Sequence, residues 1–182
     1  MARAPNRWTN NAPVALITEE GDFNWFVRQL RLGAALLGSV KARAVVGVLD
    51  GIVWQANALA AYVVVGDCRG LLQFSTNNNT VEIEQWVTAA DARGAGVPML
   101  EWLIAAQHAT TVKLFPIAGS EAVYRRLGFV GPGQGGYMNL VLADSAYWAN
   151  VGNAMRYTGP PPPPPADPPP ADPVAPPPPP PA

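Results

Sequence analysis

The stretch VEIEQWVTAADARGAGVPMLEWLIAAQ, residues 81–107, sets the fold, because it joins a strand, a glycine turn and a helix. In residues 81–89, β-branched and aromatic side chains alternate with polar ones, which predicts a half-buried strand. Residues 97–109 predict a helix, with Pro98 tolerated in its first turn. Between them, Gly94 and Gly96 let the backbone approach a ligand closely, and the N–H groups that open the helix suit a phosphate.

The segments on either side of this stretch predict further strands and helices. Upstream we expect a strand at 13–20, a helix at 22–38 capped by Asp22 and stopped by Gly38, and a hairpin over 42–66 with Asp50-Gly51 at its turn. Residues 68–80 are ambiguous, with a loop at 77–79. Downstream we expect a strand at 111–117, a short helix at 120–128 and a last strand at 135–143. The order β-α-β-β-β-α-β-α-β predicts an α/β domain with a mixed sheet.

The C-terminal segment differs from the rest in composition. From Gly159 it reads GPPPPPPADPPPADPVAPPPPPPA and holds 16 of the 21 prolines. Consecutive prolines fix φ and lack N–H donors, so the segment predicts polyproline II, either as a spacer or as a ligand for a polyproline-binding partner. We therefore expect an N-terminal arm at 1–12, one domain at 13–150 and a disordered proline-rich tail at 151–182.

Charge and metal-ligand counts narrow the classes of function. The chain has 12 basic and 13 acidic residues, and two of the acids, Asp167 and Asp172, lie in the tail. A domain this close to neutral gives no reason to expect nucleic acid as a partner. One cysteine, Cys68, and one histidine, His108, cannot build a zinc cluster, so we expect no metal and interpret Cys68 as a buried residue.

Residues 45–66 are apolar and about long enough for a membrane span. They are interrupted by Asp50, Gln55 and Asn57, and the N-terminal region has no apolar stretch that suits a signal peptide. We therefore expect no membrane segment and a soluble, cytoplasmic protein.

A second motif lies downstream of the glycine turn. In SEAVYRRLGF, residues 120–129, Tyr124 stands four residues before Gly128-Phe129, and GGYMNLVL follows at 135–142. With the glycine turn, this succession resembles the GNAT acetyltransferase superfamily, whose members bind the coenzyme A pyrophosphate at such a turn. The resemblance covers residues 13–143. It implies direct transfer of an acyl group from acetyl-CoA, or another acyl-CoA, to a primary amine of a small molecule or peptide.

The resemblance also implies roles for particular residues. Tyr124 would give a proton to the departing thiolate, since a phenol with an ordinary pKa near ~10 is protonated at neutral pH. Glu82 and Glu84 are candidates for the base that accepts the amine proton. Strict alternation would place both on the face opposite Ile83 and Val87. Coenzyme would be bound by the strand and turn residues Trp86, Val87, Thr88, Arg93, Gly94, Ala95, Gly96 and Val97.

The family's turn has the pattern Arg/Gln-x-x-Gly-x-Gly/Ala, and this chain departs from it at one position in each of two possible alignments. Aligned from the helix side, Gly94 and Gly96 are the glycines and Asp91 takes the basic position. Aligned from the strand side, Arg93 takes the basic position and Pro98 the second glycine position. If Asp91 faced a pyrophosphate it would repel it, whereas Arg93 would attract it.

Two other functions remain open from the sequence. A protein of this fold can lose catalysis and act as a binding module, here with the proline-rich tail as the ligand of its partner. By analogy of fold alone, the chain could instead modify a nucleic-acid base, which its near-neutral charge does not favour.

Overall fold

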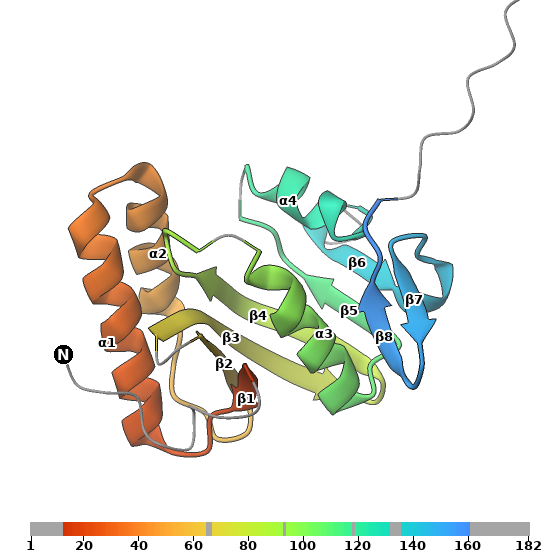
Figure 1. The fold of residues 1–182 in the computed structure, drawn as a ribbon, viewed down its shortest axis with the longest axis horizontal. Coiled ribbons are helices and arrows are strands. Elements are labelled where there is room, and N and C mark those ends of the chain that lie inside the picture. The colour runs from red at the N-terminus through yellow and green to blue at the C-terminus, as the bar shows by residue number, and fades with distance from the viewer. Residues whose placement is uncertain (1–12, 65–66, 93, 118, 132–135, 161–182) are drawn as a thin grey trace, which may run out of the picture.

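The computed structural model describes residues 13–64, 67–92, 94–117, 119–131 and 136–160. Its main sheet has six strands in the order of the chain: β1 (Val14–Leu16), β2 (Leu59–Val64), β3 (Asp67–Asn77), β4 (Thr80–Thr88), β5 (Thr111–Leu114) and β6 (Met138–Val141). Neighbouring strands are antiparallel except β4 and β5, which are parallel. The predicted α/β class with a mixed sheet is therefore confirmed (Figure 1).

Helices cover both faces of this sheet (Figure 1). Helices α1 (Glu20–Leu37) and α2 (Val40–Gly51) pack on one face, where Ala61 and Leu71 point into a shared core. Helix α3 (Gly96–Gln107) packs on the other, against Ala60 and Leu72, and Tyr124 of α4 (Glu121–Arg126) packs against the same core. Because alternate strand residues feed alternate cores, both faces of the sheet are buried here. In the described segments, no helix combines the length and apolarity that a membrane crossing requires.

Helix α1 is the helix expected at 22–38, and it ends as predicted at Gly38, with a left-handed φ of 56°. The predicted cap at Asp22 was wrong. The cap position is Glu19, and Asp22 is buried in the first turn next to Phe23. The carboxylate therefore lies inside the helix rather than ahead of it.

The predicted hairpin over 42–66 was also wrong, because residues 40–51 form α2. The Ser39 hydroxyl accepts a hydrogen bond from the Ala42 N–H at 3.1 Å and caps the helix. Ala42, Val45 and Leu49 are buried, at helical spacing, in the core that α2 shares with α1. The first strand of that hairpin therefore does not exist. Its second strand corresponds in part to β2, the strand expected at 81–89 is β4, and the ambiguous segment 68–80 supplies most of β3.

Strand β4 contains a β-bulge. Consecutive residues Gln73 and Phe74 of β3 pair with Gln85 and Ile83 of β4, which leaves Glu84 as the extra residue. A bulge exchanges the faces that the following side chains occupy. The candidate base Glu84 is therefore at the one place where the regular strand is interrupted.

Two consequences of the bulge prepare the site. Ile83 packs in the core under α3, whereas Val87 packs in the core under α1 and α2, so the expectation that they share a face was wrong. The pairing of β4 with β5 ends at Ile83 and Leu114, while β4 continues to Thr88. The pairing of the two parallel strands therefore ends immediately before the bulge residue Glu84.

A second, two-stranded sheet follows β6 and was missed by the sequence analysis: β7 (Trp148–Val151) and β8 (Ala154–Tyr157). The Trp148 indole N–H donates to the Leu127 carbonyl at 2.8 Å, just past α4. Arg156 forms a 2.8 Å ion pair with Glu101 of α3. The hairpin therefore braces both helices, and β8 lies beyond residue 151, where the tail was expected to begin. The tail residues 161–182 and the arm 1–12 lie outside the described residues.

Candidate active site

A cavity of about 540 Å³ opens where β4 parts from β5. Its walls come from β4, the glycine turn, the first turn of α3, and α4, with one residue from α2. Six of the eight residues expected to bind coenzyme line it: Trp86, Thr88, Gly94, Ala95, Gly96 and Val97. The Val87 side chain does not, since it is 4% exposed in the core on the other face. Arg93 lies outside the described residues.

The two glycines of the turn are needed for different reasons. Gly94 has a φ of 72°, in the left-handed region that glycine adopts without strain. Gly96 opens α3, and a Cβ there would lie 3.3 Å from Cζ2 of Trp86, so a larger side chain would displace the indole. At the cap position, Ala95 makes no side-chain hydrogen bond to the helix. The first-turn N–H groups of α3 are therefore left without a side-chain cap beside the cavity.

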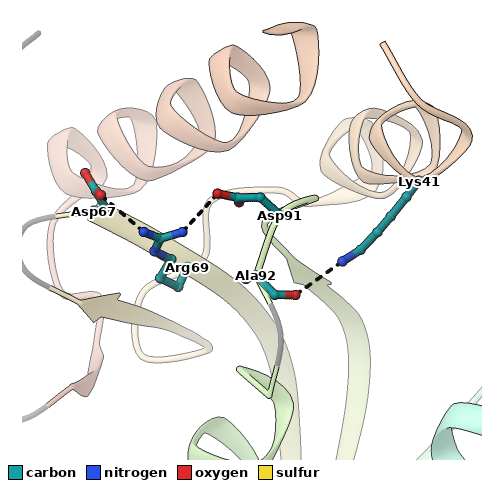
Figure 2. Close-up of polar contacts among 5 residues, drawn as sticks. All are labelled: Lys41, Asp67, Arg69, Asp91 and Ala92. Atoms are coloured by element: carbon teal, nitrogen blue, oxygen red, sulfur yellow. Dashed lines mark hydrogen bonds and ion pairs between the residues drawn. The ribbon is translucent and has the colours of Figure 1, made fainter. Parts of the chain in front are cut away.

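Figure 2 shows what holds the turn from outside. The Asp91 carboxylate accepts a hydrogen bond from Arg69 of β3 at 3.1 Å, and Arg69 also contacts Asp67 at 3.4 Å. Asp91 is directed toward Arg69 and is not among the residues that line the cavity. The repulsion expected from an inward-facing Asp91 is therefore removed by its pairing with Arg69.

Two cations line the cavity, and neither was among the residues predicted from the sequence to form the site. Lys41 projects from the first turn of α2, and its Nζ donates to the Ala92 carbonyl at 3.3 Å (Figure 2). Arg126 lies on the α4 wall. Among the described residues that line the cavity there is no carboxylate, so its charge favours an anionic ligand.

Tyr124 lies in α4 and forms part of the cavity wall. Its ring centroid is 6.0 Å from that of Trp86 and 6.0 Å from that of Phe129, so aromatic contacts hold it on both sides. Burial raises the pKa of the phenol, and a hydrogen bond with the Ser120 side chain offsets part of this rise. The hydroxyl is therefore protonated at neutral pH, as an acid must be.

The two candidate bases have different surroundings. The Glu82 carboxylate contacts Lys113 Nζ at 2.7 Å and accepts a hydrogen bond from the Tyr137 hydroxyl at 2.7 Å. These two partners lower the pKa of Glu82, which makes it a weaker base. Glu84 is exposed, at the bulge where β4 and β5 part.

The other candidates for chemistry are Cys68 and the side-chain types that bind metals. Cys68 is 7% exposed, as interpreted, and burial raises the pKa of its thiol to about 12. It therefore stays protonated and unreactive. Within the part of the chain that the structure describes, no three His, Cys, Asp or Glu side chains come together to hold a metal ion.

No protein-family model matches the chain, and no curated protein sequence matches it. Solved structures similar to it include a GNAT family acetyltransferase from Brucella melitensis in complex with acetyl-CoA, with 14% identity, 81% of this chain and 98% of that chain covered, and a TM-score of 0.43. Aminoglycoside 6'-acetyltransferase type Ii has 15% identity, coverage of 70% and 96%, and a TM-score of 0.45. Tetrahymena GCN5 has 12% identity, coverage of 69% and 93%, and a TM-score of 0.45. These neighbours belong to the family that the sequence resembles, and at such values the likeness bears on neither activity nor acceptor.

Proposed function

We propose that this chain is an acyl-CoA-dependent N-acyltransferase that moves an acyl group, most simply acetyl, to a primary amine of a small molecule or peptide. One observation carries the proposal. A single cavity joins the glycine turn, which suits phosphate, to Tyr124, which suits proton donation to a leaving group, although the two are far apart in sequence. Coenzyme binding and proton donation to the leaving group can therefore take place in one continuous space, and the candidate base Glu84 lies outside its lining.

The residues of the cavity fit an acyl-CoA. The uncapped first turn of α3 offers N–H groups and the positive end of a helix dipole, which suit the pyrophosphate. Beyond Ile83, β4 no longer pairs with β5, so its backbone edge can hydrogen-bond the amide-bearing arm of the coenzyme. Trp86 and Thr88 lie on this segment and line the cavity.

Acyl transfer needs one proton moved off the amine and one moved onto sulfur. The bond from the amine nitrogen to the acyl carbon forms as the bond from that carbon to sulfur breaks. Tyr124 supplies a proton to the departing thiolate, and backbone N–H groups of β4 beyond the bulge polarise the acyl carbonyl. Direct transfer requires no nucleophile from the protein.

Of the two carboxylates on β4, the proposal assigns the base to Glu84. Its exposure at the bulge lets it accept the amine proton directly or through a water. Glu82 is engaged by Lys113 and Tyr137, and its lowered pKa reduces its tendency to accept a proton. We assign Glu82 to holding β4 against β5.

The test is an acetyl-transfer assay with acetyl-CoA and a panel of primary amines and short peptides. Free thiol and the acetylated product are measured together. We expect amine-dependent thiol release, reduced roughly 10²-fold or more in Glu84→Gln and largely retained in Glu82→Gln, which removes the same charge two residues away. Equal losses in the two variants would contradict the assignment of the base, and a wild-type protein that binds acetyl-CoA but acylates no amine would contradict the proposed reaction.

A further inference from the structure

Lys41 belongs to α2, which lies outside the glycine-turn motif. Its side chain nevertheless lines the cavity that the motif helps to form. The residue lies two positions after Ser39, whose side chain caps α2, so the start of this helix is fixed in place. From there the ammonium group reaches Ala92, 51 residues later in the chain (Figure 2). Helix α2 therefore supplies a charge at the edge of the turn itself.

Among the described residues, the contact with Ala92 brings no negative charge to Lys41. A backbone carbonyl is a neutral acceptor, and the 3.3 Å separation is long for a hydrogen bond from an ammonium group. The acid next to Ala92 in the chain, Asp91, is paired with Arg69 on the other side of the turn. Lys41 is thus a cation beside the cavity whose hydrogen-bond partner among the described residues is a neutral oxygen.

We propose that Lys41 is a phosphate-binding residue, which exchanges the Ala92 carbonyl for the pyrophosphate of the bound acyl-CoA. The inference rests on the proposed function and adds a residue to it. A phosphate oxygen is a far better partner for an ammonium group than a neutral carbonyl, since the hydrogen bond is then charge-assisted on both sides. Arg126 faces the same space from α4, so cations approach the ligand from two walls.

This exchange gives the cavity a preference among thiol carriers. A carrier with a pyrophosphate gains the contact with Lys41, whereas pantetheine, which has the same thiol-bearing arm and no phosphate, does not. Dephospho-CoA keeps the pyrophosphate and lacks only the 3'-phosphate. It should therefore depend on Lys41 as strongly as coenzyme A does.

The experiment is calorimetric titration of the full chain with coenzyme A, dephospho-CoA and pantetheine. The variants are Lys41→Met and, as the matched control, Arg43→Met, which removes one exposed charge from the same helix outside this cavity. We expect Lys41→Met to bind coenzyme A and dephospho-CoA about tenfold more weakly, the lower end of what a charge-assisted hydrogen bond contributes. Its affinity for pantetheine, its melting temperature and the behaviour of Arg43→Met should match the wild type.

Each outcome decides between the alternatives. Wild-type affinity of Lys41→Met for coenzyme A would overturn the inference and leave the proposed function intact. An equal loss for pantetheine would mean that the substitution acts through the fold, and a loss for coenzyme A alone would assign Lys41 to the 3'-phosphate, and either result overturns the proposed exchange. A wild-type protein that binds none of the three would remove the proposed function together with this inference.

Discussion

Two groups of polar side chains lie near the point where β4 and β5 part, and they differ in how their members are paired. Outside the cavity lining, the Glu82 carboxylate contacts both Lys113 and Tyr137 at 2.7 Å, so these three groups satisfy one another. At the cavity, Tyr124 and Lys41 line an open space, and the hydrogen-bond partner of Lys41 among the described residues is the neutral Ala92 carbonyl. Paired groups hold strands together, whereas groups left available can act on a ligand. A hydroxyl or a charge alone therefore does not identify the site, because each group contains one tyrosine and one lysine.

The largest expected effect distinguishes the two tyrosines, Tyr124 of the cavity and Tyr137 of the paired group. Tyr124→Phe and Tyr137→Phe each delete one hydroxyl and keep the ring. We expect Tyr124→Phe to lower kcat by roughly 10²- to 10⁴-fold, the range for a positioned acid, with little change in the Kd for acetyl-CoA. Tyr137→Phe should keep a kcat near that of the wild type in the same thiol-release assay. A Tyr124→Phe enzyme with full turnover would mean that the phenol only packs.

The pH dependence of kcat sharpens the same point. An acid works only while protonated, so activity is lost as pH rises through its pKa. Because burial raises the pKa of Tyr124, we expect the alkaline fall of kcat to lie above pH ~10, the ordinary value for a phenol. The fall should be missing from the residual activity of Tyr124→Phe. If the variant keeps the same alkaline limb, another group is titrating.

A smaller effect separates the glycine turn from a glycine elsewhere. Gly94 and Gly38 both have positive φ, 72° and 56°, and a Cβ at either would meet no atom within 4 Å. Gly94→Ala and Gly38→Ala therefore carry a similar backbone strain, of order 1 kcal/mol, and similar small falls in melting temperature. Only Gly94→Ala should weaken acetyl-CoA binding, by about tenfold, because backbone N–H groups of the turn would shift away from the phosphates. Equal affinities in the two variants would detach the turn from the ligand.

The smallest expected effect is on stability and comes from the ion pair between Glu82 and Lys113. The folded pKa of Glu82 is lowered, chiefly by its hydrogen bond with Lys113, so its stabilisation is present above the unfolded value of ~4.3 and is lost as pH falls through the folded pKa. Both side chains are partly exposed, so the loss is at most about 1 kcal/mol. Urea unfolding between pH 6 and pH 3 should show a shallower acid decline in Glu82→Gln. Lys113→Met should flatten the curve likewise, and a decline as steep as that of the wild type in both variants would show that the pair contributes nothing.

The sequence predicted the parts of the site that depend on local patterns. Strand, turn and helix over 81–107 follow from alternation, glycine and helical spacing, and the Tyr124 motif is contained in ten residues. The hairpin prediction failed at residues 40–51 because the valines and the pair Asp50-Gly51 favour a hairpin locally. Burial of its apolar stripe against α1 decides for a helix, and Ser39 was the signal that could have shown it.

The other parts of the site depend on how neighbouring strands and helices align, which no local sequence pattern contains. The bulge at Glu84 arises from how β3 and β4 align, and the pairing of Glu82 with Lys113 arises from how β4 and β5 align. Lys41 reaches the turn only because α2 packs beside the end of β4. Side chains brought together by such contacts, rather than by sequence spacing, had to come from the structure.

The central claim is that the cavity where β4 and β5 part binds an acyl-CoA. It is tested most directly by titrating acetyl-CoA into the wild-type protein, followed by calorimetry and by tryptophan fluorescence, to which Trp86 in the cavity wall contributes. The account predicts saturable binding at one site, with a Kd between about 1 μM and 1 mM, the range usual for enzyme substrates. It also predicts that Gly96→Val, whose side chain would press on the Trp86 ring from a Cβ 3.3 Å away, loses this binding while remaining folded. A folded wild-type protein that takes up no acetyl-CoA at several-fold above that range, or a Gly96→Val variant that binds as well as the wild type, would contradict the claim.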